Sequence, residues 1–232
     1  MNKSFKYQSI SELSKLLKNK TISPVELTSY FLDKLETQGS DYNAIAHINR
    51  SSAINQAKKA ESQIMKDQYI GSLHGIPFAA KDLLSTNDGS PTSWGAKPFI
   101  NNIYNIESTV ISNLKNSGAI LCAKTSMVEF AGGMGYQQPD ASAFGPGINP
   151  WNKAYWSGGS SSGSGSAVSA GLIPFAIFFS MTGLFLMGIA SLVECSAVGA
   201  FGATLAALLK GKLNWPVIEN TLKKTLGVSC MF

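Results

Sequence analysis

Residues 118–125 read GAILCAKT, an apolar run that begins after a glycine and ends at Lys124. Continuous apolar runs of this length are typical of strands that are buried on both faces of a sheet. The residues before it, 107–117, have the apolar spacing of a helix, and we expect a further helix with Glu129 and Phe130 after it. Strands that alternate with helices predict an α/β fold, with a sheet covered by helices.

A second apolar run lies upstream, where residues 75–80 read GIPFAA and end abruptly at Lys81 and Asp82. Burial of a lysine at the end of such a run would lower the pKa of its ammonium group and favour the neutral amine. A solvated Lys81–Asp82 pair at the start of a helix is the plainer alternative. Lys124, at the end of the other run, is expected to be structural.

Helices are predicted in the first part of the chain. Residues 8–20 have an apolar face at helical spacing, and residues 51–67 form a third helical stretch rich in alanine and lysine. Between them, Ser23 is a natural N-cap and Pro24 suits the first helical position, so that a helix is expected to run to about Gln38 and to end at Gly39.

Composition restricts the function classes. The chain has 19 basic and 14 acidic residues, and Arg50 is its one arginine. No basic stripe interleaved with aromatic residues is present, which argues against nucleic-acid binding. Its three cysteines are widely spaced and fit neither a metal site nor a disulfide framework, so that a reducing compartment is expected. The N-terminus lacks the apolar region of a signal peptide.

Residues 157–166 read SGGSSSGSGS and have the composition of a flexible linker. However, residues 167–171 continue as a small-residue helix that enters a strand at 173–177. A Gly/Ser loop that opens a packed helix is also a common way to bring backbone N–H groups against a reacting group.

Taken together, these segments resemble the amidase signature family. The matching blocks are residues 23–27, 75–77, 81–82, 118–120, 124–125, 129–130, 142–145, 149–151, 158–163, 170–171 and Pro174. Ser162 departs from the family, which usually has glycine at this point. The resemblance implies a partial amidase-signature fold, a mixed sheet covered by helices, over residues 1–177.

The resemblance further implies a Ser–Ser–Lys triad that hydrolyses amide bonds or moves the released ammonia. By motif, Lys81 is its general base and Ser160 its bridging serine, with Ser161 and Ser162 as competing hydroxyls in the same loop. Gly133, Met134 and Ser161 are assigned to substrate binding, and tight packing is the alternative for the glycines of that stretch. The family implies a small-molecule amide as substrate, no metal, no cofactor and a cytoplasmic location.

The attacking serine of the triad is absent in the family register. Residues 178–184 read FFSMTGL, and Leu184 stands where the family has its nucleophile. A leucine side chain has no nucleophilic atom, so that the chain is expected to be inactive. Ser180 and Thr182 lie nearby, but in an apolar run with one glycine to shape a turn.

Residues 178–232 differ from the rest, since Glu194 is the one formal charge between Leu172 and Leu209. From about residue 183 the sequence resembles a TRAP-type dicarboxylate transporter large permease subunit, in particular over residues 188–202 (GIASLVECSAVGAFG). This resemblance implies an apolar helical segment of membrane type and inner-membrane association through residues 172–210. A membrane transport fragment, a non-functional chimera and a buried soluble hairpin are the alternatives for this segment.

Overall fold

The computed structural model describes residues 4–132 and 138–176, together with residues 204, 208, 211, 214–216, 218–219 and 221–223. The chain divides into two units, Met1–Ile177 and Phe178–Phe232. The fold and the site described below lie in the first unit. The assignment of the two units as a truncated amidase-signature domain and a permease fragment stays a prediction.

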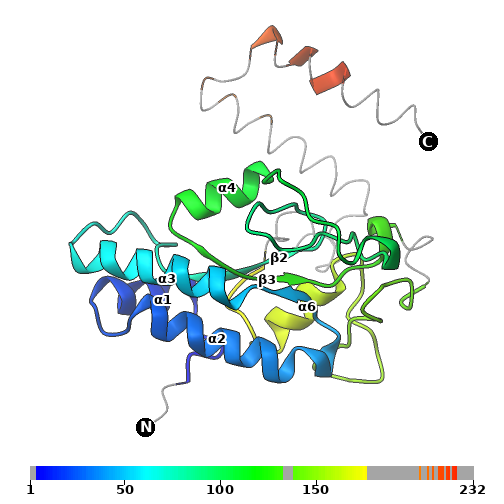
Figure 1. Cartoon of the computed structure of the whole chain (residues 1–232), viewed down its shortest axis with the longest axis horizontal. Helices are drawn as coiled ribbons and strands as arrows, with labels where there is room; N and C mark the ends of the chain where they lie inside the picture. The colour runs from blue at the N-terminus through cyan, green and yellow to red at the C-terminus, as the bar shows by residue number, and fades with distance from the viewer. Residues whose placement is uncertain are drawn as a thin grey trace. The chain divides into compact units, whose positions relative to one another are not determined.

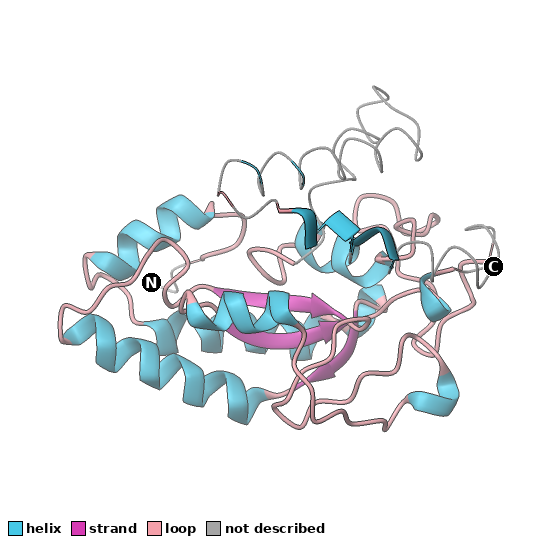
Figure 2. Cartoon of the chain, turned by 90° about the horizontal axis from the view of Figure 1, so that it is seen from above, coloured by secondary structure: helices cyan, strands magenta, loops and turns pink. Residues whose placement is uncertain are grey.

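The first unit is built on a three-stranded mixed sheet. Its strands are β1 (Ile45–Ile48), β2 (Pro77–Lys81) and β3 (Ile120–Thr125), in the order β1-β3-β2. The central strand β3 pairs parallel with β2 and antiparallel with β1. Every residue of β2 and β3 is buried, as the two apolar runs predict. Figure 2 shows the three strands side by side among the helices.

Helices surround this sheet. They are α1 (Ile10–Lys18), α2 (Pro24–Gln38), α3 (Arg50–Met65), α4 (Thr109–Asn116) and α6 (Ser162–Ser169), with 3-10 turns η1 (Ser40–Tyr42), η2 (Lys97–Phe99) and η3 (Glu129–Ala131). In Figure 1, α4 lies on one side of the sheet, and α1 and α2 lie on the other. The alternation of strands and helices confirms the α/β class.

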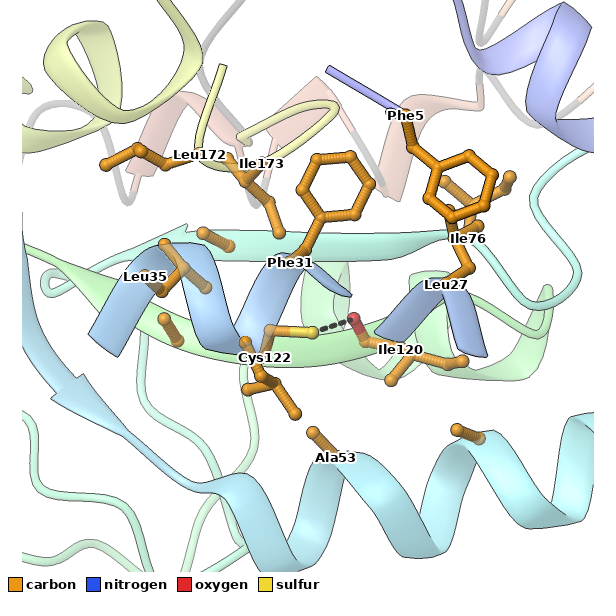
Figure 3. Packing of buried hydrophobic residues seen from close by; sticks show 14 of the residues in the cluster. Phe5, Leu27, Phe31, Leu35, Ala53, Ile76, Ile120, Cys122, Leu172 and Ile173 are labelled. Carbon is orange, nitrogen blue, oxygen red and sulfur yellow. Dashed lines mark hydrogen bonds between the residues drawn. The ribbon is translucent and has the colours of Figure 1, made fainter. Parts of the chain in front are cut away.

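The core consists of two clusters on opposite faces of β2. Phe78 and Ala80 belong to the smaller one, to which α4 contributes Ile111, whereas Ala79 belongs to the larger one. Successive strand residues point to opposite faces, which explains this division. Figure 3 shows the larger cluster, where side chains of α2 and α3 meet Cys122 of the central strand.

Local sequence signals explain where the helices start. The Ser23 hydroxyl accepts a hydrogen bond of 3.0 Å from the Glu26 N–H, and Pro24 is the first helical residue of α2. The helix ends at Gln38 before Gly39, as predicted. The helices expected over 51–67 and 107–117 are also confirmed, as α3 and α4.

Two predictions of secondary structure were wrong. The helix expected at Glu129 and Phe130 is only the 3-10 turn η3, because Phe130 has a φ of 49° and Ala131 one of 58°, outside the right-handed helical region. The strand expected over 173–177 is reduced, in the described residues up to 176, to one parallel bridge between Ala176 and Ala79 of β2.

In the part of the chain that the structure describes, we find no helix that is long and apolar enough to cross a membrane. Most of residues 178–232 lie outside the described residues. The membrane-type segment, and the permease resemblance from which it was inferred, therefore stay predictions.

Candidate active site

Lys81 and Ser160 meet in the interior of the first unit. Lys81 is the last residue of β2, and Ser160 lies in the Gly/Ser loop two residues before α6. Their side chains are joined by a hydrogen bond of 2.7 Å between Lys81 Nζ and Ser160 Oγ, although 79 residues separate them in sequence. Both residues are only 9% exposed. The two residues to which the family resemblance assigns proton transfer are thus in direct contact.

The Lys81 amine is suited to accept a proton. Burial of its side chain lowers the pKa from 10.5 to about 8, because a low-dielectric surrounding disfavours the ammonium form. A substantial fraction of the side chain is therefore neutral near pH 8, where an exposed lysine is almost fully charged. A neutral amine can take the proton of the adjacent Ser160 hydroxyl.

The loop that carries Ser160 is fixed by close packing against the end of β3. The Val128 N–H donates to the Ser160 carbonyl at 3.0 Å, and the Gly163 N–H donates to the Ser126 carbonyl at 3.1 Å. A Cβ at Gly163 would lie 2.3 Å from the Ala44 carbonyl oxygen, so that only glycine fits. The linker interpretation of residues 157–166 is therefore wrong, because α6 is buried and anchored.

Asp82 and Lys124 form a second buried pair beside the site. Lys124 Nζ lies 3.1 Å from Asp82 Oδ1, and their side chains are 1% and 2% exposed. Lys124 also donates to Thr92 Oγ1 at 2.7 Å, and Asp82 Oδ2 accepts from the Ser93 N–H at 3.0 Å. The alternative of a solvated Lys81–Asp82 pair is therefore wrong, since each of these two residues has another buried partner.

Sequence reasoning missed this pair, although it expected Lys124 to be structural. No local pattern marks this pair, because it depends on the strand pairing, in which Lys124 lies opposite Ala80 in the register of β2 and β3. Asp82 is two residues beyond Ala80, on the same side of an extended chain.

The other residues expected at the site have a mixed outcome. Ser161 is 4% exposed, and among the described residues its hydroxyl has no hydrogen-bond partner. Its role in substrate binding stays a prediction. Gly133, Met134 and Leu184 lie outside the described residues.

Lys81 and Ser160 have no metal cluster beside them among the described residues. No group of three or more histidine, cysteine or acidic residues is found there that could hold a metal ion. A hollow of about 470 Å³ lies elsewhere, along the first turns of α3, lined among others by Asn49, Lys59 and Asp88. Neither Lys81 nor Ser160 contributes to it.

Comparison with known proteins gives concordant results. The model of the Amidase family matches residues 26–177. The A subunit of the glutamyl-tRNA(Gln) amidotransferase of Coxiella burnetii (strain Dugway 5J108-111) is 43% identical over 167 residues, which are 72% of this chain and 34% of that protein. The protein of the same name from Saccharophagus degradans is 37% identical over 165 residues, which are 71% of this chain and 33% of that protein.

Solved structures agree. The peptide amidase from Stenotrophomonas maltophilia has a TM-score of 0.68 at 25% identity, over 73% of this chain and 35% of that one. A bacterial aryl acylamidase of the amidase signature family has a TM-score of 0.67 at 27% identity, over 74% and 35%. The chain thus spans about a third of the length of the curated relatives and solved structures that it matches.

Proposed function

The chain belongs to the amidase family, and from this premise we propose that residues 1–177 carry the proton-transfer half of an amide-hydrolysing site. In this proposal Lys81 is the general base, and Ser160 relays a proton to it. The hydrogen bond of 2.7 Å between Lys81 Nζ and Ser160 Oγ carries the proposal. Its length lies in the range over which a base takes a proton directly.

The relay follows from the donor and acceptor capacities of the two groups. A hydroxyl both donates and accepts, so that Ser160 Oγ can receive a proton from an attacking group and pass its own to Lys81 Nζ. Lys81 can accept it only as a neutral amine, and its burial favours that form. Ser161, whose buried hydroxyl lacks a partner in the described residues, is proposed to contact the substrate.

We further propose that this chain does not turn over amides. In the register of the family, Leu184 occupies the position of the attacking serine. A hydrocarbon side chain cannot form the covalent acyl intermediate, and loss of a nucleophile lowers kcat by roughly 10⁶-fold in serine hydrolases. Lys81 and Ser160 would then be the remaining part of a triad that was complete in the ancestor.

The substrate class proposed for that ancestor is a small carboxamide. The curated relatives are the A subunits of glutamyl-tRNA(Gln) amidotransferases, which supports an origin among enzymes that transfer an amide nitrogen. It also makes the other subunits of such an amidotransferase the proposed partners, in the cytoplasm. No cofactor or metal has a part in the proposal.

An ammonia-release assay with glutamine and simple aliphatic amides tests the proposal. We expect the rate of the full chain to equal the uncatalysed background and to be unchanged by Lys81→Ala. Turnover above background that Lys81→Ala abolishes would refute the proposal, because it would show that a hydroxyl of this chain attacks amides.

The transporter and chimera alternatives concern residues 178–232 and stay predictions from the sequence. Their test is extraction from membranes of cells that express the full chain, compared with a variant that ends at Ile177. The transporter alternative requires that the full chain stays in the membrane until detergent is added. It also requires that the shorter variant is released without detergent.

A further inference from the structure

We propose that Ser160 is itself a nucleophile in this chain, and that it forms with Lys81 a two-residue dyad that accepts an acyl group from small activated esters. The proposal rests on the proposed function in one respect, namely that no other serine attacks first. It assigns to Ser160 a reaction that goes beyond the relay of a proton.

The geometry of the pair is that of a nucleophile and its base. A distance of 2.7 Å separates Ser160 Oγ from Lys81 Nζ, and serine–lysine pairs of this kind activate a hydroxyl without a histidine. The Ser160 backbone is held by the bond from the Val128 N–H to its carbonyl oxygen. The hydroxyl is thereby kept against the amine.

The neighbouring hydroxyls differ from Ser160 in this respect. Ser164 Oγ is paired with Thr125 Oγ1 at 2.7 Å, and Ser166 Oγ donates to a backbone carbonyl at 2.8 Å. Ser161 and Ser162 are buried, and their hydroxyls have no partner in the described residues. Of the five serines between 160 and 166, Ser160 is therefore the one that lies against a base.

The surroundings of Ser160 also favour its attack. Helix α6 begins at Ser162, two residues further on, so that the positive end of its dipole is close to Ser160. Such an end stabilises negative charge that develops on an attacking oxygen or on a carbonyl oxygen. The exposed fraction of 9% restricts the reagent to a small acyl group such as acetyl.

The leaving group explains why esters react and amides do not. An amide nitrogen must be protonated before it leaves, and its tetrahedral intermediate needs strong oxyanion stabilisation. A p-nitrophenolate leaves as a stable anion and needs no proton. Reaction with an activated ester is therefore compatible with the absence of amide turnover.

The step is balanced as follows. The Ser160 Oγ–H proton moves to Lys81 Nζ, and Oγ forms a bond with the carbonyl carbon of p-nitrophenyl acetate. The bond from that carbon to the phenolic oxygen then breaks, which gives acetyl-Ser160 and p-nitrophenolate. The Lys81 ammonium returns its proton to water.

The test is reaction of the full chain with p-nitrophenyl acetate, followed by peptide mass spectrometry. Alkaline hydroxylamine removes acetyl esters and leaves acetyl-lysines intact, so that it separates Ser160 from the 18 lysines of the chain. We expect a hydroxylamine-sensitive acetyl group on the Ser160 peptide. Lys81→Met should slow its formation at pH 8 by about 10²-fold or more. Ser162→Ala, which removes a buried hydroxyl from the same loop, is the matched control and should leave the rate unchanged.

A second measurement needs no variant. The rate of Ser160 acetylation should rise with pH and level off above about pH 8, where the pKa of Lys81 lies. An unlabelled Ser160 in the folded chain would overturn the proposal, and so would a rate that rises in proportion to hydroxide without a plateau. An acetyl ester on a hydroxyl between residues 178 and 184 would instead refute the proposed function. The dyad would still be tested separately, by whether the Ser160 peptide is acetylated.

Discussion

Replacement of Lys124 by methionine should destabilise the first unit strongly. The substitution removes the cation that lies 3.1 Å from Asp82 Oδ1 and leaves a carboxylate that is 2% exposed without its counter-charge. Loss of one partner of a buried ion pair costs about 3–5 kcal/mol, because the remaining charge stays desolvated. Methionine keeps most of the volume of the side chain, so that a cavity contributes little. Urea-induced unfolding of the full chain, followed by circular dichroism, measures the change.

Lys20→Met is the matched control. Lys20 Nζ lies 2.8 Å from Asp67 Oδ1, a shorter distance than in the buried pair, but the two side chains are 37% and 86% exposed. An exposed pair of this kind contributes about 0–1 kcal/mol, since water and salt screen it. The same substitution at two ion pairs thus separates the effect of burial from the effect of distance.

A double variant isolates the role of the orphaned carboxylate. Lys124→Met together with Asp82→Asn should be more stable than Lys124→Met alone, because the amide leaves no uncompensated charge and can still accept from the Ser93 N–H. The reasoning fails if Lys124→Met costs no more than Lys20→Met. It also fails if the double variant is the less stable of the two.

Two further predictions concern close packing and pH. Gly163→Ala should lower stability by about 1–3 kcal/mol, because its Cβ would lie 2.3 Å from the Ala44 carbonyl oxygen. Gly165→Ala, whose nearest contact would be at 3.8 Å, should be neutral or stabilising. Thermal melting of both variants measures the difference, and equal melting temperatures would contradict the prediction. Burial lowers the pKa of both histidines, His47 and His74, from the ordinary 6.5, so that the unfolded chain binds protons below about pH 6.5 more readily than the folded one. Stability should be full above that pH and fall as the pH drops through it. His74→Gln should make the free energy of unfolding depend less on pH in urea titrations between pH 5 and 7. An unchanged pH dependence in this variant would refute the prediction.

Much of the first unit could be predicted from local sequence. The two runs that became β2 and β3 are apolar at every position up to their terminal polar residues, and burial on both faces of a sheet requires this composition. Ser23 and Pro24 located the start of α2 because capping depends on groups within one helical turn. Burial of Lys81 at the end of a strand was one of two interpretations that the apolar run before it left open.

Only the tertiary structure decided which groups act together. The contact between Lys81 and Ser160 spans 79 residues, and no local pattern sets a distance of that kind. Asp82 and Lys81 are adjacent in sequence, yet one is bonded to Lys124 and the other to Ser160, because successive residues of an extended chain point to opposite faces.

The Gly/Ser stretch shows the same division. Its composition fits a flexible linker and a closely packed helix equally well, since both need small residues. What distinguishes them is the space available, and at Gly163 a backbone carbonyl and a strand end leave no room for a side chain. Sequence therefore determined which segments are buried, whereas packing between distant segments determined that Lys81 is buried and that Ser160 is its partner.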